Sequence, residues 1–86
     1  MCEKFIKSYE CAKADIDRWY RKVCRDKEKN KKEDAIGCIG CIGTAYILAC
    51  ILIKDFNMDV KEECIHMVQL MDYLKSDILG INSTEI

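Results

Sequence analysis

The residues most able to do chemistry are two cysteines separated by two positions, Cys38 and Cys41. Thiol–disulfide enzymes use this spacing because a helix N-terminus lowers the pKa of the first thiol and the second thiol resolves the mixed disulfide. Here the neighbouring residues are apolar, which raises a thiol pKa, and no βαβ pattern surrounds the pair. We therefore expect both cysteines to be small buried residues, with redox chemistry as the alternative.

A metal site is the second chemical candidate, because four residues have the side chains that tetrahedral zinc prefers: Cys38, Cys41, Cys64 and His66. Cys64 and His66 are two positions apart, so one helix would point them in nearly opposite directions. Glu63 and His66 also have the spacing of di-metal bundles, but the chain holds a single copy. We expect no metal, no cofactor and no catalysis, since nucleophile and phosphate-loop motifs are also missing from the sequence.

The number of cysteines and the first residues of the chain predict the redox state of its cellular compartment. The chain has 7 cysteines in 86 residues, an odd number, and its first residues contain no apolar signal segment. We expect free thiols in a reducing cytoplasm, as in other intracellular proteins.

Composition narrows the class of protein. Lys and Arg total 14 and Asp and Glu total 15, a net charge of -1, which argues against general nucleic-acid binding. Half of the residues are hydrophobic and none is proline, as expected of one folded helical domain over residues 1–86. No family resemblance emerges from the motifs.

Apolar periodicity divides the chain into three helices. Heptad-like spacing predicts amphipathic helices over about 2–28 and about 59–79, with Asp59 as an N-cap and Gly80 just past the end. Between them, about 35–54 forms a helix that carries no charge until Lys54. A turn at 29–34 ending in the N-cap Asp34 and a tail at 80–86 complete the prediction of an all-α three-helix bundle.

The central helix is apolar on every side, so it must be buried on every side or lie in lipid. Two neighbours leave part of its surface uncovered, and we therefore expect a homo-oligomer. Small side chains on one face suit close packing, within the chain or between chains: Gly37, Gly40, Cys41, Thr44, Ala45 and Ala49. The alternative is a single membrane span with a cytoplasmic N-terminus, since the run is long enough to cross a bilayer.

These features favour a small non-enzymatic binding or inhibitor protein that occupies the surface of a partner protein. The candidate partner surface lies on the first helix: Arg18, Tyr20, Arg21 and Arg25. Small Lys- and Ile-rich chains of this kind are common among phage and mobile-element accessory proteins, including inhibitors of host defence. That last expectation follows from general composition and from no motif.

Overall fold

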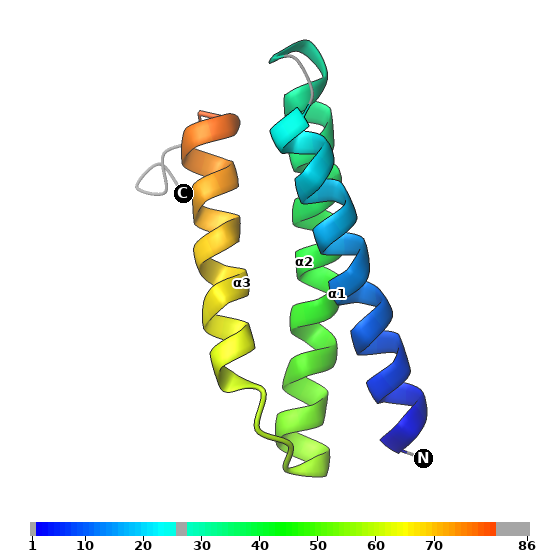
Figure 1. Ribbon diagram of the computed structural model, residues 1–86. Coiled ribbons are helices and arrows are strands. Elements are labelled where there is room, and N and C mark those ends of the chain that lie inside the picture. The colour runs from blue at the N-terminus through cyan, green and yellow to red at the C-terminus, as the bar shows by residue number, and fades with distance from the viewer. Residues whose placement is uncertain (1, 26–27, 81–86) are drawn as a thin grey trace.

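The computed structural model describes residues 2–25 and 28–80, and these form an all-helical arrangement (Figure 1). Helix α1 covers Cys2–Arg25, α2 covers Glu28–Phe56 and α3 covers Lys61–Tyr73, continued by a π-helical turn η1 at Leu74–Ile78. Helix α2 lies between α1 and α3 and runs antiparallel to both (Figure 1). The predicted all-α fold with three packed helices is confirmed.

The packing of α1 on α2 follows from the apolar stripe of α1. Tyr9, Ala12, Ile16 and Val23 recur at helical spacing and are all buried, because this spacing places them on one side of the helix. They meet a row of fully buried α2 residues: Ala35, Cys38, Ile42, Ala45, Ala49 and Leu52. The contact extends to the far end of α1, where the Phe5 and Phe56 rings lie 5.5 Å apart.

Gly37 allows the closest approach between these two helices. A Cβ atom at this position would lie 2.9 Å from the Trp19 ring, which is shorter than carbon–carbon contact permits. The indole therefore packs on the backbone of α2. A Cβ atom at Gly40 or Gly43, by contrast, would meet no neighbouring atom within 4 Å.

Helix α3 packs against the core formed by the other two helices. Met67 is the buried residue of α3, and it joins the core cluster together with Val60, just before the helix, and Leu74, the first residue of η1. A polar contact fixes α3 to α1: the Tyr9 hydroxyl donates a hydrogen bond to Glu63 Oε1 at 3.1 Å, and Lys13 Nζ donates to the same oxygen.

Two left-handed residues end the long helical segments. Asn57 has φ 54°, and the Met58 amide donates to the Leu52 carbonyl at 3.0 Å, so α2 stops and the chain reverses. Asn is one of the few non-glycine residues that adopt this conformation readily. Gly80 has φ 72° and follows Leu79, as the sequence predicted for the end of the third helix.

The helix boundaries differ from the sequence-based prediction in three places. The first helix was expected to reach about residue 28, but α1 ends at Arg25 and Glu28 already belongs to α2. The turn expected at 29–34 is wrong, because α2 already begins at Glu28 and Asp34 lies inside the helix. Residues 29–34 include no apolar side chain, but Lys and Glu are strong helix formers. This segment is therefore a solvent-exposed part of the helix. Asp59 is not the N-cap of α3; Val60 holds that position, and its carbonyl accepts from the Cys64 amide at 3.2 Å. Residues 81–86 of the predicted tail lie outside the described residues.

The Trp19–Gly37 contact predicts a specific cost for adding one methyl group. Gly37→Ala should lower the free energy of unfolding by about 1–3 kcal/mol, because the indole must move away from α2. The matched control is Gly43→Ala, whose Cβ meets open space and which should not lower stability in dilute solution. Urea denaturation of both variants measures the difference. Equal stability of the two would contradict the close packing.

Candidate functional site

The Cys-x-x-Cys pair is embedded in the helix core. Cys38 is fully buried and its thiol donates to the Ile16 carbonyl at 3.6 Å. Burial, together with the nearby Cys41, raises the pKa of Cys38 from 9.0 to about 11. Burial also raises the pKa of the half-buried Cys41. Both thiols are therefore held in the protonated form, the opposite of an activated redox pair.

The structure does not bring the four candidate zinc ligands together. Cys64 lies on α3 near Cys50, away from Cys38 and Cys41, and His66 is exposed. No group of three or more His, Cys, Asp or Glu side chains suited to a metal occurs among the described residues. Six cysteines whose side chains the structure describes are free thiols: Cys11, Cys24, Cys38, Cys41, Cys50 and Cys64.

Glu63 has a structural partner that the sequence did not reveal. Its hydrogen bond from Lys13 lowers the pKa of the Glu63 carboxyl, and the bond from Tyr9 adds to this effect. Lys13 also lies 4.7 Å above the Tyr9 ring, so the three side chains form one cluster between α1 and α3. Glu63 is therefore engaged in helix packing, where the Glu-x-x-His spacing had suggested a metal ligand.

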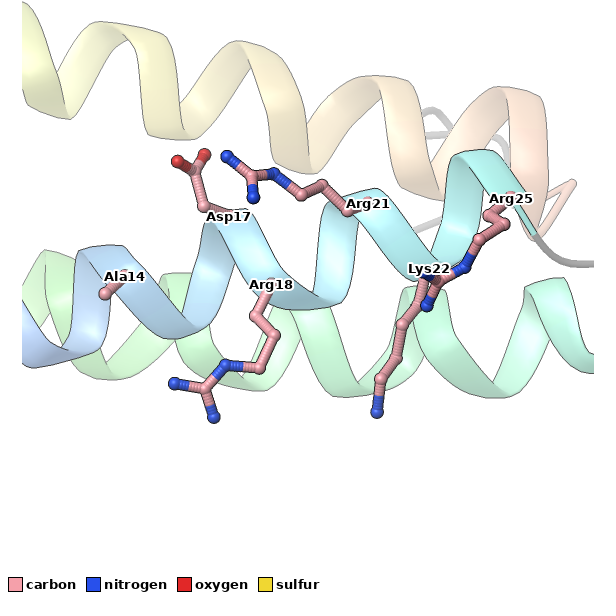
Figure 2. A pocket seen from close by; sticks show the side chains of 6 residues that line it. All are labelled: Ala14, Asp17, Arg18, Arg21, Lys22 and Arg25. Carbon is pink, nitrogen blue, oxygen red and sulfur yellow. The ribbon is translucent and has the colours of Figure 1, made fainter.

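A basic face forms at the C-terminal end of α1. We define it as Arg18, Arg21, Lys22 and Arg25, which line an open hollow of about 430 Å³ together with Ala14 and Asp17 (Figure 2). Arg18 and Lys22 extend to one side of the helix, whereas Arg21 extends back toward Asp17 (Figure 2). Four cations against two carboxylates, Asp17 and the Asp15 that pairs with Arg18, leave a net positive surface. Cations near a helix C-terminus are also favoured by its dipole.

Two details of the basic face differ from its sequence-based description. Tyr20 is half-buried and packs against the core, and a hydrogen bond with Cys24 raises its pKa. Lys22, which the sequence analysis did not select, lies 4.6 Å above the Trp19 ring. Arg18 makes an exposed ion pair with Asp15 at 3.3 Å, an interaction of small energy.

The small-residue face of α2 is turned mainly toward α1. Ala45 and Ala49 are fully buried within the chain, and Gly37 lies under Trp19. The other three members, Gly40, Cys41 and Thr44, line a shallow hollow beside α1 with Ala12 and Asp15.

A different face of α2 has no covering helix among the described residues. It runs through Ile36, Gly40, Gly43, Ile47 and Cys50, with spacings of 4, 3, 4 and 3, and is called the α2 stripe here. Ile36 and Ile47 are 61% and 63% exposed, and Gly40 and Gly43 face open space. Only 28% of the most apolar 18-residue window of this helix is buried. Sequence reasoning missed the stripe, although its heptad spacing was present in the letters.

Helix α2 is also long and apolar enough over Asn30–Phe56 to cross a membrane, judged by length and composition alone. It is the one such helix in the part of the chain that the structure describes. A buried helix of a soluble protein meets the same criterion, so its surroundings have to distinguish the two cases.

Comparison with known proteins yields no relative: no family model, no curated protein and no solved structure matches this chain. The fold therefore defines only a class, a small all-helical chain whose described residues include the uncovered α2 stripe and the basic face of α1. Any functional assignment rests on those two surfaces.

Burial of Cys38 predicts a loss of stability in alkaline solution. The unfolded thiol has a pKa of 9.0 and the folded one about 11, so rising pH ionises the unfolded state first. The contribution of Cys38 to the free energy of unfolding should be constant well below pH 9.0 and should fall as the pH rises from 9.0 towards about 11. The raised pKa of Tyr9 acts in the same direction.

The measurement is urea denaturation across this pH range for the wild type and for Cys38→Ala. The variant should be less stable at neutral pH but should show a shallower alkaline decline. Thiol labelling at neutral pH adds a check: the exposed Cys11, Cys24 and Cys50 should react quickly and Cys38 only after unfolding. Rapid labelling of Cys38 in the folded chain would contradict its position in the core.

Proposed function

We propose that this chain is a non-enzymatic helical binding module that self-associates and occupies the surface of a partner protein. The observation that carries the proposal is the α2 stripe, where Ile36 and Ile47 are the two most exposed of the described large hydrophobic side chains, ahead of Ile65 and Val68 on α3. Contiguous exposed apolar surface in a soluble chain marks an interaction site. Cys38 and Glu63 do not favour a catalytic function instead, because Cys38 is held protonated and Glu63 is paired with Lys13.

The basic face of α1 is the second surface in this proposal, and it suits a partner with acidic side chains. Arginine supplies several fixed donors to carboxylates and is enriched at protein interfaces. Because the four cations lie on exposed or half-exposed positions of a rigid helix, they can bind without reorganising the core. An accessory inhibitor of the phage or mobile-element type would act in this way, by covering a surface of its target.

Charge reversal tests the role of the basic face. Arg21→Glu combined with Arg25→Glu should reduce partner capture from host extract by at least tenfold while circular dichroism remains helical. The matched control is Lys4→Glu with Lys7→Glu, the same charge change at exposed positions near the other end of α1. The control should keep the captured protein, identified by mass spectrometry. Equal loss in both doubles would indicate a non-specific charge effect, and equal retention would contradict the proposed surface.

A membrane-spanning protein is the second candidate, supported by the length and composition of α2. The packing argues against it. Helix α1 follows α2 from Phe56 to Gly37, so Lys13 and Glu63 lie beside the middle of α2, where a bilayer would place them in hydrocarbon. A span through α2 would therefore require the three helices to separate.

Cell fractionation distinguishes the two candidates. The bundled form should be recovered in the soluble fraction without detergent, because its charged helix faces remain in water. Recovery in the membrane pellet after carbonate extraction would establish the spanning form. The measurement is an immunoblot of both fractions, with a known membrane protein and a known cytoplasmic protein as markers.

A further inference from the structure

Self-association, as proposed above, requires a partner for the α2 stripe, and the order of residues along the stripe specifies that partner. Read with its flanks, the heptad spacing extends from Glu33 to Lys54 in steps of 3, 4, 3, 4, 3 and 4. Both flanking residues are exposed. The α2 stripe is thus flanked by an acid before it and a base after it, and it has a glycine at its centre.

We infer that two copies of the chain pair antiparallel through the α2 stripe, with Ile47 of each copy seated over Gly40 of the other. Reversing the stripe against itself places Glu33 opposite Lys54, Ile36 opposite Cys50 and Gly43 opposite Gly43 of the second copy. Each exposed isoleucine then meets a small residue, and both ends of the interface hold an acid–base pair. This contact is a two-fold, self-complementary interface.

The glycines give this arrangement its fit. No atom lies within 4 Å of a Cβ at Gly40 or Gly43, so the monomer leaves a notch in the stripe. Ile47 is 63% exposed and projects from the next turn of the same face. A bulky side chain beside a notch is complementary to its own inverted copy, because knob and hole exchange places.

A parallel pair fits less well on the same residues. In a parallel pair Ile47 would face Ile47 of the second copy and Gly40 would face Gly40. The two isoleucines would crowd each other, and the two glycines would leave a gap. A parallel pair would also oppose Lys54 to Lys54 and Glu33 to Glu33, and like charges repel. Antiparallel helices additionally align their dipoles favourably.

The first experiment is absolute mass by light scattering after size exclusion in reducing, detergent-free buffer. The wild type should be a dimer, Ile47→Glu should be a monomer with unchanged helix content, and the matched Ile47→Leu should remain a dimer. Gly40→Ala and Gly43→Ala should weaken dimerisation at least tenfold, although each Cβ meets open space in the isolated chain. A wild-type monomer, or protein that needs detergent, would overturn both this inference and the proposed self-association.

The second experiment measures orientation with a short bismaleimide cross-linker in a Cys2→Ser, Cys11→Ser, Cys24→Ser background. One chain retains Cys50 and the other carries Ile36→Cys with Cys50→Ser. In the antiparallel pair neither chain should cross-link alone, and the mixture should give a covalent dimer. A parallel pair would cross-link each chain alone.

The outcomes separate the inference from the proposed function. Cross-linking of each chain alone, or a dimer that survives Ile47→Glu, would overturn the antiparallel interface while self-association through some surface still stood. Partner capture by the basic face is measured independently of both results.

Discussion

A helix with apolar residues around its whole circumference requires neighbours on every side, and this requirement governs the structure. Helix α1 covers one side of α2, with Gly37 removing the side chain that would separate the Trp19 ring from the backbone. The segment that contains α3 and η1 covers a second side, through the buried Val60, Met67 and Leu74. A chain of 86 residues has no further helix among its described residues to cover the third. The uncovered α2 stripe is the direct consequence.

The polar groups near the core serve packing. Cys38 is fully buried, and its thiol donates to the Ile16 carbonyl, so its hydrogen-bonding group is satisfied without water. Glu63 joins Lys13 and Tyr9 and thereby holds α3 against α1. The same burial and pairing that stabilise these groups move their pKa values away from those that acid–base or thiol chemistry near neutral pH requires.

Helix α2 illustrates why composition alone does not separate a core helix from a membrane span. Both need a long apolar segment, and Asn30–Phe56 satisfies the length and composition of either. The difference lies in the neighbours, since α1 and α3 carry charged faces along the length of α2. Those faces are the reason we propose that a second apolar surface, and not lipid, covers the α2 stripe.

The sequence by itself determined the helices, because apolar spacing along α1 and α3 and the charge-free run of α2 are local patterns. It also determined the stop at Gly80, where a left-handed residue is required. It misjudged the start of α2, because loss of apolar positions at 29–34 marks exposure to solvent and does not end a helix formed by Lys and Glu. The tertiary structure alone decided which sides of α2 are covered. Rotation of α2 about its axis depends on how Trp19 packs on Gly37 and how α3 docks, and these contacts join residues far apart in the chain. That rotation buried Ala45 and Ala49 and exposed Ile36 and Ile47, and the docking of α3 paired Glu63 with Lys13.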